Sequence, residues 1–526
     1  MEFAIDPSFK IYSGGLGFLA GSHMRSAAAL QQNLVGIGIH WTCGYYNQTR
    51  GDGGEMAVQY RRKHPAFLRE TGLEFQIRIY DQDVWLRALY LSPEIFGTVP
   101  MFFLTSDDDR NSAFSRSFTQ RLYDQDPTVR IAQYMVLGRG GARLLEELGV
   151  EPERYHLNEA HGISAGLRLL ERLGDPAQVR ERLVFTTHTP EDAGNEKTDL
   201  PLLHRAGFFG DLDQDRINAL LDHEHSYLFN HSLAALRLAR RANAVSALHG
   251  EVSRAMWARY DNICPITHIT NAQNKKFWAD PALEQAKIAK DVPMLRQRKR
   301  ELKEQLCRTV MDQTGKLMNP DVLTIVWARR FAGYKRADLI AQDKKALRDL
   351  LNQYNQPVQL LWAGKPYPSD YSAIDTFNSL SALTSPYPNA AVLVGYELAL
   401  SRQLKQGSDI WLNTPIIGRE ASGTSGMTAA MNASISLTTQ DGWICEFGKH
   451  LHNSFLIPPA APELDPQQRD DHDRNAIFQQ ILQNVLPLYY EQPDAWAQLC
   501  FQAMEDIAPQ FDSDRMAAEY YSILYA

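Results

Sequence analysis

The sequence predicts an α/β protein built from two doubly wound, Rossmann-like domains that face a cleft. Three observations predict this fold class. The 526 residues exceed what one compact core usually holds. Apolar, strand-like runs alternate with segments of helical periodicity, which is typical of parallel sheets. The alternation stops at a highly charged stretch in the middle of the chain and then resumes.

The first series, residues 1–310, is expected to form the N-terminal domain. Residues 34–41 (LVGIGIHW) indicate a strand, and residues 131–149 have helical spacing that ends at a glycine. The segments RYHLNEA and RLVFTTHTP read as short buried strands that end in polar residues. Strands separated by helices pair in parallel and place ligands at their carboxyl ends.

The second series, residues 311–526, is expected to form the C-terminal domain, with the final helices packing back on the first. Before it, residues 282–313 are helical and highly charged, and we interpret them as a solvated helix pair that joins the domains. Five strands are then predicted in order: residues 322–328, 358–364, 390–396, 409–415 and 433–443.

Bulk composition excludes several classes of function. The net charge of -8 argues against nucleic acid or an anionic membrane as the main partner. No apolar run is long enough to span a bilayer, and no signal-peptide pattern opens the sequence. The five cysteines are scattered without CxxC spacing, which argues against a disulfide framework or a zinc site. We therefore expect a cytoplasmic protein with no metal.

Two groups of residues in the first half suit a polyhydroxylated ligand. Gly14, Gly15 and Gly17 precede a helix and would let the backbone approach a ligand closely, although such a turn is as often a plain tight loop. His161 and His188 each follow a predicted strand, beside other polar residues that include Asn158. A lone histidine is more often structural than catalytic, and HxxxH metal spacing is absent.

Two groups in the second half suit an anion. Arg329, Arg330, Lys335 and Arg336 cluster directly after a predicted strand, and cations are disfavoured at a helix N-terminus, which favours a phosphate site over a solvated helix start. The stretch 419–432 (REASGTSGMTAAMN) leads from Glu420 through small and hydroxylated residues into a helical run. We expect it to cradle an anion whose counter-charge comes from Arg329, Arg330 and Lys335 across a short gap.

In this order, the motifs resemble the α-glucan (glycogen, starch and maltodextrin) phosphorylase family, especially its short bacterial form. The matching segments span nearly the whole chain: MEF, IYSGGLG, HLNEAH, FTTHTP, LHGEVSRAMW, ITN, ARRFAGYKRA, AGKPYP, QGSDIWLNTP and EASGTSGM. The resemblance implies the two-domain glycosyltransferase B fold and reversible, retaining transfer of glucose between an α-1,4-glucan and phosphate. It also implies pyridoxal phosphate as cofactor, with the N-terminal domain binding the glucan and the C-terminal domain the phosphate.

The resemblance carries residue roles to matching positions. Arg330 and Lys335 resemble the substrate-phosphate clamp, and Arg329 a contact to the cofactor phosphate. His188, Asn271 and Glu420 resemble ligands of the glucose hydroxyls, with Leu16 beside the sugar. Among these, His188, Arg330, Lys335 and Glu420 are the expected catalytic residues. Other expected sugar contacts are Gly14, Gly15, Asn158, His161, Ser422 and Gly423, and the expected phosphate cradle is Gly15, Thr424, Ser425 and Gly426.

The main departure from the family pattern is Thr428, which stands where the family has the lysine that forms the Schiff base with pyridoxal phosphate. Threonine has no amine, so we expect any pyridoxal phosphate to be bound without a covalent link, if it is bound. Other departures are Ala272-Gln273-Asn274 after ITN, Pro366 and Tyr367 after AGK, and Ser22. The MEF start lies inside the family's first strand, so residues are expected before it.

Three hypotheses follow. The first is a phosphorylase-type enzyme acting on an α-glucan or maltooligosaccharide with phosphate or glucose 1-phosphate. The second is a retaining transferase that uses a nucleotide sugar, which the absence of the lysine favours. The third is a non-catalytic glucan-binding pseudoenzyme, against which Arg330 and Lys335 count, since an idle site needs no cation clamp. A homodimer is among the expected assemblies.

Overall fold

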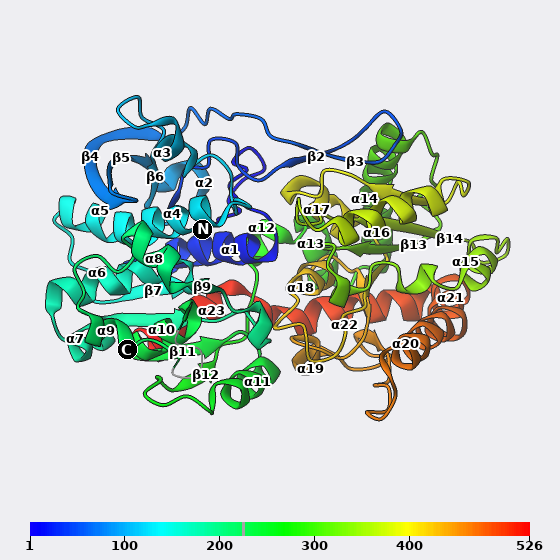
Figure 1. Cartoon of the computed structure of the whole chain (residues 1–526). Helices are drawn as coiled ribbons and strands as arrows, with labels where there is room; N and C mark the ends of the chain where they lie inside the picture. Colours follow the sequence, from blue (N-terminus) through cyan, green and yellow to red (C-terminus); the bar gives the residue numbers. More distant parts are fainter. Residues whose placement is uncertain (223–226) are drawn as a thin grey trace. The chain divides into compact units, whose positions relative to one another are not determined.

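The computed structural model describes residues 1–222 and 227–526. It divides into two compact units, whose elements are drawn in Figure 1. Unit 1 comprises Met1–Tyr46, Tyr60–Asn271 and Ser513–Ala526, and unit 2 comprises Asn47–Gln59 and Ala272–Asp512. Both units are mixed α/β and contain a parallel sheet.

The parallel sheet of unit 1 has the strand order β12-β11-β8-β7. Its strands confirm the two short buried strands predicted around the histidine motifs. Asn158 and Thr186 are paired at the carboxyl ends of β7 and β8, so the residues that follow these two strands emerge side by side. The strands are β7 (Tyr155–Asn158), β8 (Leu183–Thr186), β11 (Arg241–Ala244) and β12 (Ile266–His268).

A second sheet of unit 1, of order β1-β6-β5-β4, is mixed rather than parallel. Only β1 and β6 pair in parallel, whereas β5 is antiparallel to both of its neighbours. The sequence interpretation of purely parallel pairing is wrong here. Along β4 exposed and buried residues alternate, which is typical of a sheet with one solvated face. The strands are β1 (Gly36–Ile39), β4 (Arg69–Ile79), β5 (Gln82–Leu91) and β6 (Met101–Thr105).

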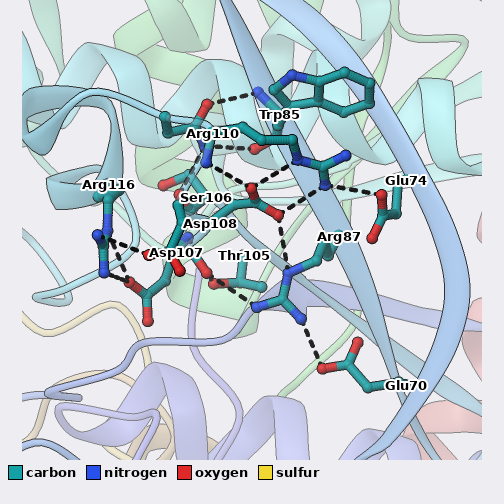
Figure 2. Close-up of polar contacts among 12 residues, drawn as sticks. Glu70, Glu74, Trp85, Arg87, Thr105, Ser106, Asp107, Asp108, Arg110 and Arg116 are labelled. Atoms are coloured by element: carbon teal, nitrogen blue, oxygen red, sulfur yellow. Dashed lines mark hydrogen bonds and ion pairs between the residues drawn. The ribbon is translucent and has the colours of Figure 1, made fainter.

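A network of ion pairs covers the exposed face of the β4–β5 hairpin (Figure 2). Asp108 accepts from Arg110 Nε at 2.8 Å and from Arg87 Nε at 3.3 Å. Arg110 also reaches Glu74 at 2.8 Å and lies over the Trp85 ring, 4.0 Å from its centroid. The network fixes the loop after β6 onto the hairpin.

Helices cover the sheets of unit 1, and a short antiparallel pair joins β9 (Lys197–Asp199) to β10 (Leu228–Asn230). The helix predicted over residues 131–149 is confirmed, with a π-helical turn at Val136–Gly140 between α4 and α5. The helices are α1 (Gly15–Ala29), α2 (Pro93–Phe96), α3 (Ala113–Ser117), α4 (Pro127–Met135), α5 (Gly141–Glu147), α6 (Ile163–Leu173), α7 (Pro176–Arg182), α8 (Leu200–Ala206), α9 (Gln214–Asn218), α10 (His231–Leu238), α11 (Ala247–Trp257) and α23 (Ser513–Glu519).

The sheet of unit 2 has the order β15-β14-β13-β16-β17-β18, and each neighbouring pair is parallel. All residues of β13 and β14 are buried, as expected for continuous apolar runs in a sheet covered on both faces. The order reverses next to β13, where doubly wound sheets bind ligands. The five predicted strands are confirmed: β13 (Leu323–Ala328), β14 (Val358–Ala363), β15 (Ala390–Leu393), β16 (Ile410–Asn413) and β17 (Ile435–Thr438), with β18 (Ser454–Leu456) added.

Residues 47–59 form an antiparallel hairpin of β2 (Asn47–Arg50) and β3 (Met56–Gln59) that groups with unit 2. The helices of this unit are α12 (Lys275–Trp278), α13 (Pro281–Ala289), α14 (Val292–Thr314), α15 (Lys344–Leu351), α16 (Tyr371–Thr384), α17 (Leu398–Gly407), α18 (Ser425–Ala430), α19 (Ile444–Phe447), α20 (Pro466–Gln480), α21 (Leu486–Glu491) and α22 (Pro493–Phe511). No helix within 1–222 or 227–526 is long and apolar enough to cross a membrane.

The charged middle stretch forms α13 and α14, but α14 is not a solvated connector. Its Leu306 and Val310 lie in one apolar cluster with Val326 of β13. Lys299 and Lys303 are 8% and 3% exposed, and their ammonium groups are satisfied by oxygens such as the Asp409 carboxylate, 2.6 Å from Lys303 Nζ. The boundary expected at residue 310 therefore falls inside a helix of unit 2. The chain passes between the units after residues 46, 59, 271 and 512 instead.

Candidate functional site

A buried cluster of two cations and one carboxylate lies at the carboxyl end of β13 in unit 2. Arg329 Nη2 and Lys335 Nζ both donate to Oε2 of Glu420, at 2.7 and 2.8 Å. The side chains of Arg329, Lys335 and Glu420 are 5%, 10% and 9% exposed. Burial alone would raise the pKa of the Glu420 carboxyl, but Lys335 and Arg329 hold it at about 2. Glu420 is therefore ionised, and the cluster carries one more positive than negative charge.

The four cations grouped in the sequence separate into different environments. Arg330 is exposed beside the cluster and contributes to the lowered pKa of Glu420. Arg336 belongs elsewhere, because its guanidinium pairs with Asp470 and Asp473 at 2.6 and 2.7 Å. The expected gap between the 419–432 stretch and its counter-charge is absent at Glu420, because Arg329 and Lys335 contact the Glu420 carboxylate directly.

Several buried polar atoms around this cluster have no hydrogen-bond partner among the described residues. They are Nε and Nη1 of Arg329, the hydroxyls of Ser422 and Ser425, and Nε1 of Trp443. Each can donate a hydrogen bond, and Arg329 is cationic. Buried donors are normally satisfied, so this set fits an anion or a ligand rich in hydroxyl oxygens.

The loop that carries Glu420 is held from behind by Asp441, which the sequence analysis missed. Asp441 Oδ2 accepts from the backbone N–H groups of Arg419 and Glu420 at 3.0 and 2.8 Å. Gly442 has φ +65°, and a Cβ there would lie 2.5 Å from the carbonyl oxygen of Ser422, so glycine is required for this close approach. Burial raises the pKa of Asp441 to about 6. The available signal was the Asp-Gly pair near the end of the predicted stretch 433–443, shortly after β17.

Two glycines of the 419–432 stretch bring its backbone against the Trp443 ring. A Cβ on Gly426 would lie 2.7 Å from Cζ2 of Trp443, and one on Gly423 would lie 3.4 Å from Cδ1 of Trp443. Thr424 immediately precedes α18, and its side chain makes no capping hydrogen bond. Because α18 has six residues, any anion bound here would depend on the side chains more than on a helix dipole.

The residues at position 428 and around it do not fit a covalently attached pyridoxal phosphate. The Thr428 side chain is fully buried, and its hydroxyl donates to the carbonyl oxygen of Ser425 at 3.0 Å. Its backbone oxygen accepts from Nδ2 of Asn432 at 2.8 Å. This position offers a hydroxyl that is already partnered in place of an amine. The neighbouring donors of Arg329 and Ser425 suit a phosphate group, whatever molecule carries it.

In unit 1 the structure brings His188 and Asn158 together at the ends of β8 and β7. His188 Nε2 lies 2.6 Å from Asn158 Oδ1. Glu159 accepts from the backbone N–H of His188 at 2.5 Å and from the Thr189 hydroxyl at 3.1 Å. Burial lowers the pKa of His188 to about 3, so the imidazole is neutral at pH 7. Glu159 has φ +65°, a strained conformation for a residue with a side chain.

His161 and Asn271 are placed separately within unit 1. His161 lies between the rings of Tyr123 and Tyr134, with centroids 5.7 and 5.4 Å away, and burial lowers its pKa to about 3. Asn271 is 2% exposed, and its Oδ1 has no hydrogen-bond partner in the part of the chain that the structure describes. Both are neutral polar groups, as the sequence interpretation requires.

The glycine-rich turn before α1 is partly occupied by a carboxylate of the chain itself. Glu2 accepts from the backbone N–H groups of Ser13 and Gly14 at 2.6 and 3.2 Å. A Cβ on Gly17 would lie 2.7 Å from Glu2 Oε2, so packing explains this glycine. A Cβ on Gly14 would meet no described atom within 4 Å, which leaves space beside the turn. The backbone N–H of Gly14 therefore already has a partner in the chain, while the space beside Gly14 is open.

The fold and these side chains define an α/β protein with a buried cation cluster at a sheet's carboxyl end and separate neutral polar groups in the other unit. Comparison with known proteins gives the family. The family model for carbohydrate phosphorylase matches residues 269–457. Maltodextrin phosphorylase of Thermococcus litoralis is 30% identical over 588 residues, covering 100% of this chain and 70% of the relative. Glycogen phosphorylase of Mycobacterium tuberculosis is 31% identical over 608 residues, with the same coverage.

The chain belongs to the carbohydrate phosphorylase family. An uncharacterised protein of Methanocaldococcus jannaschii is 44% identical over 526 residues and covers 100% of this chain and 98% of its own length. The chain thus shares its length with this relative and spans 70% of the two phosphorylases.

Proposed function

We propose that this protein is a retaining glucosyltransferase that transfers glucose between an α-1,4-glucan or maltooligosaccharide and phosphate. The observation that carries the proposal is the buried Arg329–Glu420–Lys335 cluster, with two further N–H groups of Arg329 unpartnered among the described residues. A phosphate group would satisfy these donors and balance the excess positive charge. Fixed cations also stabilise the negative charge of the phosphate that accepts or releases the glucosyl group.

Sugar contacts are proposed within each unit taken by itself. His188 and Asn271 supply neutral groups of fixed orientation, which suit hydroxyls, and Glu420 supplies an acceptor beside the phosphate donors. Arg330 and Lys335 are proposed to clamp the transferred phosphate. Geometry supports this assignment, because Arg330 is exposed next to the buried cluster and can therefore contact a ligand.

The fold proposed for this function is the two-domain glycosyltransferase B type. In support, unit 2 has the reversed strand order of a doubly wound sheet, and unit 1 has a parallel sheet with polar residues at its strand ends. Pyridoxal phosphate is proposed to be absent or held without a covalent bond, because Thr428 has no amine.

A second candidate is a retaining transferase that uses a nucleotide-glucose donor. Thr428 favours it, because a donor's distal phosphate would fill the same donors without any need for a lysine. Glucan binding without catalysis is the outcome if neither transfer is found.

The experiment measures glucosyl transfer and ligand affinity with one variant and one control. Purified protein is incubated with maltoheptaose and phosphate, then with glucose 1-phosphate or nucleotide sugars, with and without added pyridoxal phosphate. Arg330→Ala should weaken phosphate-ligand binding roughly tenfold to a hundredfold, the value of one charge-assisted hydrogen bond. Arg348→Ala, which changes an arginine whose side chain is 57% exposed, should leave it unchanged. Equal affinities in both variants would refute the clamp.

A further inference from the structure

The carboxyl ends of the unit 2 strands differ in whether their polar groups already have partners. Next to β13 and β16, the buried donors of Arg329, Ser422 and Ser425 lack partners among the described residues. Buried donors without a partner in the chain can be satisfied by a ligand or by ordered water. The ends of β14 and β15 are different, because the hairpin Asn47–Gln59 lies on them.

Gln48 joins the hairpin to both of these strand ends. Its Nε2 donates to the carbonyl oxygen of Gly364, directly after β14, at 2.8 Å. Its Oε1 accepts from the backbone N–H of Gly395, shortly after β15, at 3.0 Å. Gln48 is 4% exposed. One side chain thus satisfies a buried donor and a buried acceptor, and displacing it would leave two buried backbone groups unpaired.

Further contacts hold the hairpin in place. Arg50 donates to the Ser381 hydroxyl of α16 at 3.0 Å and to the carbonyl oxygen of Val392 in β15. The backbone N–H of Met56 donates to Asn378 Oδ1 at 2.8 Å. The hairpin is therefore anchored to α16 and β15 by side-chain hydrogen bonds on both of its strands.

A buried ion pair fills the same strand ends. Lys365 follows Gly364, and its ammonium lies 2.8 Å from Oε1 of Glu397. The two side chains are 5% and 15% exposed. Since these charges are paired with each other, they offer little to a ligand.

A nucleotide-sugar donor needs room for a ribose and a base beside its phosphates. In a doubly wound sheet the phosphates lie at the point where strand order reverses, and the rest of a nucleotide extends over neighbouring strand ends. With phosphate at Arg329 after β13, the strand ends on one side are those of β14 and then β15, and on the other side those of β16 and β17. The 419–432 stretch follows β16, so the hairpin lies on the opposite side, over β14 and β15. We propose that the hairpin Asn47–Gln59, through Gln48 and Arg50, occupies the place of a nucleoside and thereby limits the donor to phosphate or a sugar phosphate. This inference rests on the proposed function and decides between its two donors.

The experiment compares donor affinities by calorimetry. Wild-type protein should bind glucose 1-phosphate at least about tenfold more tightly than ADP-glucose or UDP-glucose. The double variant Gln48→Ala/Arg50→Ala removes side-chain volume and should narrow this ratio by about tenfold, through tighter nucleotide-sugar binding. The matched control Gln48→Met/Arg50→Met loses the same hydrogen bonds but keeps most of the volume, so its ratio should stay near that of the wild type.

The outcomes separate the inference from the function. The inference would be overturned if the wild type bound a nucleotide sugar as tightly as glucose 1-phosphate and Arg330→Ala lost that binding. The proposed glucosyl transfer would still stand in that case. An unchanged ratio in the folded alanine variant would also overturn it, with folding checked by urea unfolding. If the wild type bound none of these ligands or phosphate, the proposed function would fail and the inference with it. If the double variant did not fold, the single variant Gln48→Ala would be compared with Gln48→Met in the same way.

Discussion

Replacing Glu420 with glutamine tests the electrostatics of the cation cluster. The carboxylate is the shared partner of Arg329 and Lys335, and all three side chains are at most 10% exposed. Glu420→Gln removes the negative charge and leaves two buried cations close together. Removing one partner of a buried ion pair typically costs ~3–5 kcal/mol of stability.

The pKa of Glu420 corresponds to a similar contribution of this carboxylate to the free energy of unfolding. Glu420 falls from an ordinary 4.5 to about 2, which corresponds to about 3 kcal/mol at about 1.4 kcal/mol per pKa unit. Because the folded-state pKa is lowered, this stability is present above about pH 5 and is lost as pH falls towards 2.

Urea unfolding at pH 7 measures the effect, with Glu463→Gln as a matched control that changes an exposed glutamate of the same unit. Glu420→Gln should lose about 3 kcal/mol and the control less than about 0.5 kcal/mol. Inorganic phosphate should restore part of the loss, by about 2.7 kcal/mol at a hundred times its Kd. A loss below about 1 kcal/mol in Glu420→Gln would show that the two cations are solvated, and the reasoning would be refuted.

Three further predictions concern the same unit. When pyridoxal phosphate is added and the protein is reduced with borohydride, the 419–432 peptide of the wild type should carry no pyridoxyl adduct. The same peptide of Thr428→Lys should carry one if the pocket suits the cofactor. An adduct in the wild-type peptide would contradict the assignment. Asp441 has a folded pKa raised from 3.8 to about 6, so its ionisation costs stability as pH rises between these values. The free energy of unfolding of Asp441→Asn should therefore rise relative to that of the wild type between pH 4 and pH 6. If the difference between the two proteins stayed constant over this range, the Asp441 carboxyl would titrate normally. Lys303→Met should cost ~3–5 kcal/mol by leaving the buried Asp409 carboxylate unpaired, whereas a neutral result by thermal unfolding would mean that water replaces the ammonium.

The parallel sheet of unit 2 was predictable because its strands are continuous apolar runs between helices. Residues 322–328 and 358–364 contain β13 and β14, in which each residue is buried. The mixed sheet of unit 1 was not predicted, because β4 alternates exposed and buried residues and the interpretation relied on uniformly apolar runs. The periodicity of apolar residues indicates which faces of a strand are buried. A strand buried on one face has fewer apolar residues than a strand buried on both faces, so it is harder to recognise in the sequence.

The candidate site was predictable where motifs carry several polar residues together, as around Arg329 and Glu420. It was not predictable where a single residue acts through a long-range contact. Asp441 reaches the backbone of Glu420, and Glu2 reaches the backbone of Gly14. Gln48 bonds to Gly364, which lies far along the chain. Such contacts depend on the tertiary fold, and residue spacing along the sequence does not predict them.

Neither unit is continuous along the chain, and this affects how the protein can assemble during synthesis. The hairpin Asn47–Gln59 leaves the ribosome early but must wait for α16 and β15, on which it docks. Unit 1 waits longer, because Ser513 bonds to Ser26 at 2.6 Å and Tyr525 bonds to His156 at 2.7 Å. Domains usually fold in the order of their emergence. Here the first unit to emerge can be completed only after the second has been made, so a stop codon after residue 512 would leave unit 1 without its last helix while sparing the sheet of unit 2.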